Sequence, residues 1–426
     1  MSVTTAPATA PKSSAAGGGR RKLSFPMILV VLACALIAVS AVRAITGADD
    51  VTSSGQVGGA LEMAVPIGLA GLAGLWSERA GVVNIGLEGM MILGTFFGAW
   101  AGWQHGPWIG LLAGVVGGML GGLVHAIATV TFGVDHIVSG VAITLLAQGA
   151  TEYLAKMWFN TGHAARIGGS PKQSPNIASV GSITVPGLSP WLATVEKHHW
   201  FLVSDLAGVL GGLVTNLSLF TVLAAVLFAA TYFVLWRTPF GLRLRSCGEA
   251  PVAAESLGVN VYRYKYIGVI MSGGLAGFGG AFLAMVPAHA YQEGQTGGRG
   301  YIGLAAMIFG NWRPGGLAMG AGLFGYTDSL QLRNGGPAAH ALLLLLFILL
   351  VALAVRKFYR KSYKQGVAGV ISAALLLVWF LMTSTIPDEF VSITPYVATL
   401  LVLSLSAQRL RMPKADGKPY RKGQGK

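Results

Sequence analysis

The sequence predicts an all-α, polytopic membrane protein with about ten transmembrane helices and one re-entrant pair of broken helices. Of its 426 residues, 53% are hydrophobic and only 11% are charged, whereas soluble domains average about 25% charged residues. Apolar runs of about 20 residues, the length that crosses a bilayer, recur along the chain. The basic residues, which give a net charge of +14, fall at the chain ends and in short loops, as the positive-inside rule requires.

The same composition excludes several other classes of protein. The 61 glycines follow no Gly-X-Y period, which excludes collagen, and the long apolar runs exclude a disordered chain. The bases form no groove-binding patch, so we expect a lipid bilayer and no nucleic acid as partner. The two cysteines, Cys34 and Cys247, are too few for a disulfide scaffold or a metal cluster. We therefore expect no metal and no cofactor on this chain.

The chain begins with a segment that does not read as a folded element. Residues 1–25 are rich in Ala, Ser, Thr, Pro and Gly and carry Arg20, Arg21 and Lys22, which predicts a disordered, basic cytoplasmic tail. The apolar run from Pro26 to Ala44 is either the first transmembrane helix or a signal-peptide core with a cleavage site. The length of the preceding tail favours the helix.

A transmembrane domain is expected over 26–408. Its ten spans are predicted at 26–45, 58–76, 83–102, 108–131, 137–156, 216–236, 265–288, 338–355, 366–385 and 392–408. The apolar segment 301–326 is interrupted by Asn-Trp-Arg-Pro-Gly-Gly at 311–316, which no straight helix can contain. It is predicted as a re-entrant pair of half-helices shielded by protein or a water-filled cavity. The glycine runs at 114–118 and 273–280 are predicted to serve tight helix packing or a subunit interface.

Basic loops set the expected orientation. The loops 237–263 and 356–364 and the tail 409–426 are rich in Arg and Lys, which places all three in the cytoplasm. Each span crosses the membrane once, so the number of spans between these loops determines the side of every other segment. This count of spans (the parity argument) puts both termini inside, the broken segment on the outer side and 157–215 outside. The paired His198 and His199 in 157–215 lack accompanying cysteines or regular spacing. We therefore expect a solvated extracytoplasmic loop in a multi-pass membrane protein.

Motifs for enzyme chemistry are missing from the sequence. It contains no G-x-x-x-x-G-K-[ST], no H-E-x-x-H, no G-x-S-x-G and no clustered carboxylate pair within an apolar span. The chain is therefore not expected to be an enzyme, and a transport role is favoured by elimination.

The stretch 77–91, S-E-R-A-G-V-V-N-I-G-L-E-G-M-M, contains polar residues close to membrane depth. Asn84 and Glu88 are spaced i, i+4 and are expected on one face of a helix that Gly86 and Gly89 can interrupt. A carboxylate there requires a cavity or a partner. Two interpretations stay open: both residues line the translocation path, or Glu88 hydrogen-bonds a neighbouring helix at a break.

The loop 237–263 contains signals for a short cytoplasmic helix. Pro251 suits a first helical turn, Glu249 complements its positive end and Gly258 suits its stop. Such a short helix needs a docking partner, although a plain basic loop is the alternative. The residues predicted to couple to that partner are Glu249, Pro251, Ala253, Ala254, Leu257 and Gly258.

The segment 293–316 supplies a further group of polar residues. Those near its start are expected at the outer mouth, whereas Arg313, at the turn, either belongs to a gate or caps carbonyl groups at the break. The predicted solute-pathway residues are Asn84, Glu88, Gln295 and Trp312.

These motifs together resemble the permease subunits of bacterial ABC importers in the branched-chain amino acid, ribose and nucleoside superfamily. The stretch G-E-A-P-V-A-A-E-S-L-G-V-N at 248–260 is similar to the segment that contacts the ATPase. The stretch at 77–91 and E-G-Q-T-G-G-R-G-Y-I-G-L-A-A-M-I-F-G-N-W-R-P-G-G at 293–316 are similar to the nucleoside and simple-sugar branch. Both tails and the loop 157–215 lie outside the resemblance.

The resemblance implies a multi-pass permease subunit of an ATP-driven importer in the plasma membrane of a bacterial cell. It implies a nucleoside as cargo, an extracytoplasmic binding lipoprotein that delivers it, a separate ATPase subunit, and a homologous permease or a second copy as the other half of the pore. Transport would follow alternating access. A simple sugar is the alternative cargo. An ion-driven secondary transporter or a channel is the alternative class, but it would need several ionisable groups at mid-span, where Glu88 is the main candidate. A membrane enzyme is disfavoured.

Overall fold

The computed structural model describes residues 25–159, 173–333, 335–387, 389–391, 393 and 410–423. The first helices are α1 (Phe25–Thr46), η1 (Asp49–Thr52), α2 (Ser54–Arg79), α3 (Leu87–His105), α4 (Pro107–Ala126), η2 (Ile127–Thr131) and α5 (His136–Trp158). The middle of the chain forms β1 (Ser182–Ile183), α7 (Leu188–Glu196), α8 (Val203–Val214), β2 (Leu217–Ser218), α9 (Leu219–Arg237), α10 (Pro239–Glu249) and α11 (Pro251–Ser256). Then follow α12 (Val261–Met285), α13 (Arg299–Phe309), α14 (Pro314–Leu332), α15 (Gly336–Tyr359) and α16 (Tyr363–Met382).

The chain is an α-helical, polytopic membrane protein, as predicted. Among the described residues, seven helices are long and apolar enough to cross a membrane: α2, α4 with η2, α5, α9, α12, α15 and α16. Two further predicted spans, 26–45 and 83–102, are the helices α1 and α3. The predicted span 392–408 and the tail 1–25 lie outside the described residues, apart from residues 25 and 393.

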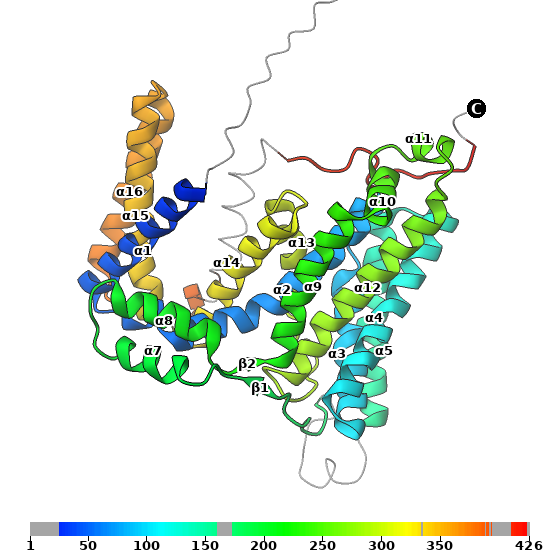
Figure 1. The fold of residues 1–426 in the computed structure, drawn as a ribbon, viewed down its shortest axis with the longest axis horizontal. Helices are drawn as coiled ribbons and strands as arrows, with labels where there is room; N and C mark the ends of the chain where they lie inside the picture. Colours follow the sequence, from blue (N-terminus) through cyan, green and yellow to red (C-terminus); the bar gives the residue numbers. More distant parts are fainter. Residues whose placement is uncertain are drawn as a thin grey trace, which may run out of the picture.

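Two groups of helices are joined by α2 (Figure 1). One contains α3, α4, α5, α9 and α12, and the other contains α1, α15 and α16, with α13 and α14 beside α2 between them (Figure 1). Most residues of α2 and α12 are buried, because these helices are apolar all round and touch neighbours on several sides. Most of α16 is exposed, as expected of a helix that faces lipid.

Glycines bring α3, α4 and α12 into backbone contact. A Cβ on Gly94 would lie 2.2 Å from the carbonyl oxygen of Gly277, and one on Gly118 would lie 2.2 Å from that of Gly273. Both distances are far too short for any side chain. The predicted packing role of these glycine runs is therefore confirmed.

The molecule has two distinct ends. The turn between α15 and α16, the helices α10 and α11 and residues 410–423 lie at one end, here called the basic end, and β1 and β2 lie at the other (Figure 1). The two basic loops predicted to face the cytoplasm, 237–263 and 356–364, therefore share one end. This arrangement agrees with the parity argument.

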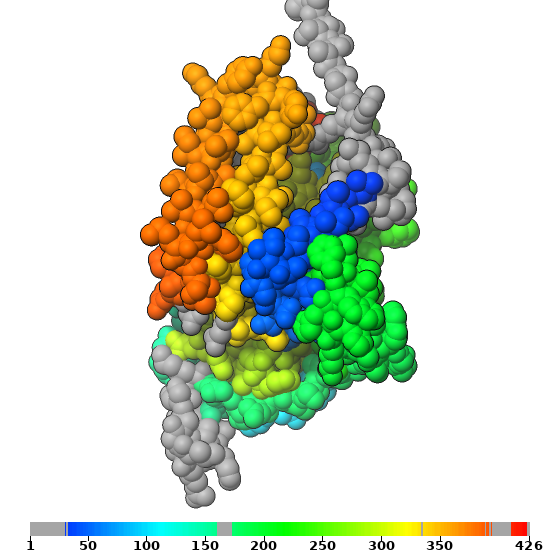
Figure 2. Space-filling view, turned by 90° about the vertical axis from the view of Figure 1, so that its left-hand side faces the viewer, coloured from blue at the N-terminus to red at the C-terminus, as the bar shows by residue number. Residues whose placement is uncertain are grey.

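The region 157–215 was expected to be a solvated loop. Most of its described residues are exposed, but they contain two helices, so the expectation of a loop is wrong there. The strand β1 pairs in antiparallel fashion with β2, which follows this region, and α7 and α8 form a helical hairpin whose α8 packs against α2. Both helices are amphipathic but shorter than a span, so a search for long apolar runs passes over them. In the space-filling view α1 lies directly against this green hairpin (Figure 2).

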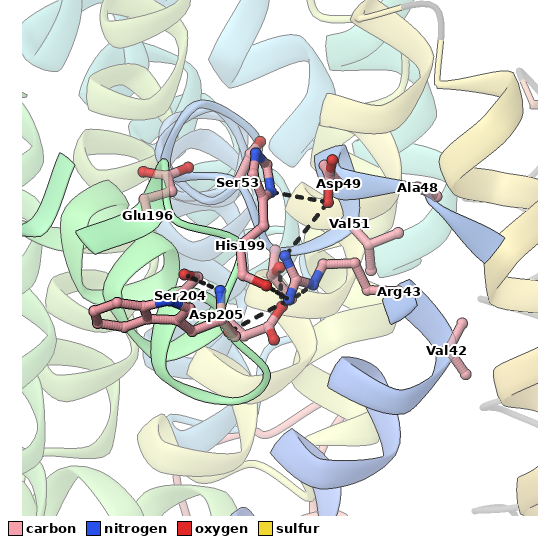
Figure 3. A network of polar contacts seen from close by, with 12 residues as sticks. Val42, Arg43, Ala48, Asp49, Val51, Ser53, Glu196, His199, Ser204 and Asp205 are labelled. Atoms are coloured by element: carbon pink, nitrogen blue, oxygen red, sulfur yellow. Dashed lines mark hydrogen bonds and ion pairs between the residues drawn. The ribbon is translucent and has the colours of Figure 1, made fainter. Parts of the chain in front are cut away.

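Buried charges fix the hairpin to α1. The guanidinium of Arg43 pairs with the buried carboxylate of Asp205 on α8 at 2.9 Å and with Asp49 on η1 at 3.3 Å. It also donates to the carbonyl oxygen of His199 at 3.3 Å. Figure 3 shows these groups converging on Arg43 from three elements. A charge buried with such partners costs far less than an unpaired one, so the helix at 26–45 folds together with the rest of the chain.

Candidate functional site

The predicted short helix at the basic end is present as α11. It begins at Pro251 and is followed by Gly258, whose φ of +81° is the left-handed conformation that favours glycine. The helix α10 precedes it and was not predicted. Thr238 caps α10, with its hydroxyl accepting from the amide of Gly241 at 3.1 Å, and Pro239 occupies the first turn. This Thr-Pro pair is a start signal that the sequence contained.

The helix α11 has an inner and an outer face. Ala254 is buried in a cluster with Cys247, Val261 and Tyr420. Ala253 and the side chain of Leu257 face outward, and Leu257 is 85% exposed. The predicted coupling residues therefore divide into a set that holds the segment in place and a set that is free to contact a partner.

Residues 410–423 cross the basic end as an ordered segment, here called the C-terminal strap (Figure 1). The backbone amide of Ala415 donates to the carbonyl oxygen of Gly248 at 2.9 Å, and the amide of Arg411 donates to the side-chain oxygen of Asn311 at 2.8 Å. The hydroxyl of Tyr420 donates to the carboxylate of Glu255 on α11. The described part of the basic tail 409–426 is thus packed against the coupling segment.

A buried carboxyl anchors the strap. Asp416 is 6% exposed and lies against Glu78 at the end of α2. Burial, and then the neighbouring Glu78, raise the pKa of Asp416 to about 9. The sequence shows only a basic tail here, because the partner of Asp416 is more than 300 residues away along the chain.

Arg79, at the end of α2, links the coupling segment to the break between α13 and α14. Its guanidinium donates to the carbonyl oxygen of Trp312 at 2.7 Å and lies 3.7 Å from the carboxylate of Glu249. Trp312 is buried, and its indole N–H donates to the carboxylate of Glu78. Asn311 and Trp312 both have positive φ, of 56° and 53°. Such strain persists only where surrounding contacts impose it.

These contacts give Trp312 a different setting from the one expected. The break at 310–313 is confirmed, and the Trp312 side chain is buried with its indole N–H donating to Glu78. Arg313 is exposed and its side chain makes no cap on α14. Glu78 and Arg79 were missed as functional candidates, although both lie in the stretch 77–91 that the sequence singles out.

The expectation that Asn84 and Glu88 share one helical face is wrong. The helix α3 begins only at Leu87, and a turn that includes Gly81, with φ of +83°, separates α2 from Asn84. Asn84 is fully buried and its amide nitrogen donates to the hydroxyl of Ser272 at 2.9 Å. Its side-chain oxygen has no hydrogen-bond partner among the described residues.

Glu88 caps the start of α13. One carboxylate oxygen accepts from the amide of Gly298 at 3.0 Å, and the other accepts from the amide of Gly300 at 2.7 Å. A helix N-terminus presents free amides and a positive dipole end, so a buried carboxylate is stabilised there. Glu88 therefore hydrogen-bonds a neighbouring helix at a break, which is the second of the two interpretations that the sequence left open.

Gln295 lies in the loop that precedes α13. Its side-chain oxygen accepts from the amide of Gln292, and its side-chain nitrogen has no partner among the described residues. Of the predicted pathway residues, Glu88 and Gln295 therefore lie at the start of α13, Asn84 lies against Ser272 of α12, and Trp312 follows the other end of α13. Of the four, Asn84 and Gln295 keep an unused hydrogen-bonding atom.

Side chains that could bind a metal ion do not cluster among the residues that the structure describes. Among the described residues, no group of three or more His, Cys, Asp or Glu side chains could hold a metal ion. Burial raises the pKa of the Cys247 thiol to about 11, so it stays protonated near neutral pH. The polar contacts described above instead connect the end of α2 to the break after α13, and the start of α3 to the start of α13.

A comparison with known families gives a direct match. The family model described as "Branched-chain amino acid transport system / permease component" matches residues 57–354. No solved structure shows a significant match to the chain.

Curated relatives match over most of their length. The chain is 35% identical over 371 residues to the guanosine ABC transporter permease protein NupQ of Bacillus subtilis, covering 85% of this chain and 95% of the relative. It is 33% identical over 363 residues to the nucleoside ABC transporter permease protein NupC of Lactococcus lactis, covering 83% and 93%. It is 25% identical over 331 residues to a glucose ABC transporter permease protein of Haloferax volcanii, covering 75% and 81%.

Proposed function

Since the chain belongs to the family of branched-chain amino acid transport system permease components, we propose that it is the membrane-spanning subunit of an ATP-driven importer that passes a nucleoside inward. The cargo is inferred from the relatives named for guanosine and nucleosides, which are 35% and 33% identical. A simple sugar is the second candidate, because a relative named for glucose matches at 25% identity. Membership in an ABC permease family disfavours the ion-driven secondary transporter.

The ATPase subunit is proposed to dock on the outer face of α11. The observation that carries this proposal is a six-residue helix at the basic end that exposes Leu257 while Ala254 anchors it. A helix this short is not stable without tertiary contacts, and Ala254 of α11 packs in one cluster with Cys247 of α10. A partner that displaces α11 would therefore move α10 with it. The Glu249–Arg79 ion pair and the Arg79–Trp312 hydrogen bond connect that movement to the break between α13 and α14. The proposed mechanism is alternating access driven from this end.

The remaining partners follow from the same architecture. A second copy of the chain or a homologous permease is proposed to supply the other half of the pore. An extracytoplasmic binding lipoprotein is proposed to deliver solute at the end that holds β1 and β2. ATP hydrolysis is assigned to the separate ATPase, with no cofactor on this chain, and both termini are placed in the cytoplasm of a bacterial cell.

Uptake by cells that lack the gene tests the cargo. We expect deletion to remove most high-affinity uptake of labelled guanosine and a plasmid copy to restore it. An excess of unlabelled adenosine or uridine should compete with the label, whereas an excess of glucose should not. Restored uptake of labelled glucose, with no restored uptake of guanosine, would contradict the nucleoside assignment and support the sugar.

A further inference from the structure

A polar cavity of about 330 Å³ opens at the end of the molecule away from α11. It lies where the first turns of α2 meet the end of α8, the start of α9 and the last residues of α12 and α14. Its volume is at the lower end of the range of about 300–1,000 Å³ that small-molecule sites occupy. Glycines of α2 and α8 line this space, and the guanidinium of Arg333 packs over Gly55.

Two ionisable side chains of opposite sign line this cavity, and neither has a partner among the described residues. Neither the Glu62 carboxylate nor the Arg333 guanidinium forms a hydrogen bond or an ion pair with another described residue, and His289 is the titratable group that interacts electrostatically with Glu62. Glu62 lies on α2 about 12 Å along the axis from its first residue. An ionisable side chain at such a position in a spanning helix, with no hydrogen bond or ion pair to another described residue, is a functional-site hypothesis by default.

Hydroxyl groups complete the lining. The side chains of Ser54 and Thr221 face the cavity, and their hydroxyls are likewise free of hydrogen bonds to other described residues. The backbone and side chain of Asn216 lie beside them. Together the lining offers a strong acceptor, a strong donor and small polar groups, which suits an uncharged solute that carries both hydroxyls and acceptor atoms.

We propose that this cavity is an outward-facing binding site for the transported nucleoside, in which Glu62 accepts hydrogen bonds from the ribose hydroxyls and Arg333 donates to acceptor atoms of the solute. The proposal rests on the proposed function for the identity of the cargo. It adds a place where the solute stops after its delivery and before it passes inward. A pathway site has to bind weakly enough to let the solute leave, so we expect the affinity of this site for the nucleoside to be modest.

Substitution of the two charges tests the proposal. The measured quantity is uptake per assembled complex of guanosine and of 2′,3′-dideoxyguanosine, which lacks the ribose diol, with the same binding protein throughout. Glu62→Gln should lower guanosine uptake about tenfold, since a hydrogen bond to a charged group contributes about that factor. It should leave dideoxyguanosine uptake nearly unchanged, so the ratio of the two falls. Arg333→Gln should lower the uptake of both compounds.

Matched controls separate the site from general effects of charge. Glu152→Gln on the surface of α5 and Arg360→Gln at the basic end should leave both uptakes unchanged. Wild-type guanosine uptake tests the proposed function itself, so a wild type that imports only a sugar would refute the cargo, whereas the variants test the cavity. A Glu62→Gln complex with the wild-type ratio, or one whose only defect is a smaller amount of complex, would overturn the proposal.

A labelling experiment gives a second readout that does not depend on transport. Thr221→Cys in a Cys34→Ser background places a thiol in the cavity lining, while the other native cysteine, Cys247, is buried at the basic end. We expect an impermeant maleimide to label it in the resting complex and guanosine to slow the labelling. Labelling that guanosine does not slow, in a complex that imports guanosine, would contradict the site.

Discussion

Leu257→Asp is expected to abolish solute uptake and ATPase association while the protein still inserts and folds. Leu257 is 85% exposed, so its loss costs the fold little. At a proposed interface core, however, an aspartate would be desolvated without a partner. Ala253→Arg, on the same outer face, should act in the same way. The measurement is copurification of the ATPase together with uptake per milligram of inserted permease.

The inner face of α11 should respond differently. Ala254→Arg forces a charge into the cluster of Cys247, Val261 and Tyr420, so it should lower the amount of folded permease as well as uptake. Tyr359→Asp is the matched control for Leu257→Asp, because Tyr359 is also 85% exposed and ends α15, at the basic end. Normal ATPase copurification in the Leu257→Asp variant would contradict docking on α11.

Glu88→Leu is expected to reduce the amount of assembled complex strongly. The substitution leaves the amides of Gly298 and Gly300 without their acceptors. Each buried unsatisfied amide costs about 1–3 kcal/mol, a large share of the ~5–15 kcal/mol that stabilises a typical protein. Glu88→Gln keeps one acceptor oxygen and should have a milder effect. The measurement is the yield of complex and the uptake per complex.

This comparison decides between the two interpretations of Glu88. A capping role predicts a lower yield with nearly unchanged uptake per complex. A role in the solute path predicts the reverse, with a normal yield and lower uptake per complex. Asn84→Leu serves as the companion variant, because the side-chain oxygen of Asn84 is unused by the described residues. Wild-type yield and uptake in both Glu88 variants would contradict both roles.

Local signals predicted a large part of this structure. A proline in the first turn and a glycine after the last one located α11, and Pro314 located the start of α14. The glycine runs predicted the close crossing of α3, α4 and α12. In each case the physical cause lies within a few residues of the feature, so the sequence displays it.

Other features depend on residues far apart in the chain and could not be predicted in this way. The C-terminal strap is held by Asn311, Gly248 and Glu255, to which no local pattern points. The hairpin of α7 and α8 depends on the Arg43–Asp205 pair, whose members are separated by 162 positions. The separation of Asn84 from the face of Glu88 follows from the turn at Gly81, and an i, i+4 spacing assumes that no such turn intervenes.

The most direct test of the central claim is transport by the purified complex in lipid vesicles. The permease, its ATPase and its binding lipoprotein would be reconstituted, and the accumulation of labelled guanosine would be followed with ATP, without ATP and with an imposed ion gradient in place of ATP. We expect accumulation only with ATP, and none with the Leu257→Asp permease. Accumulation driven by the ion gradient in the absence of ATP would contradict the assignment of this chain to an ATP-driven importer of nucleosides.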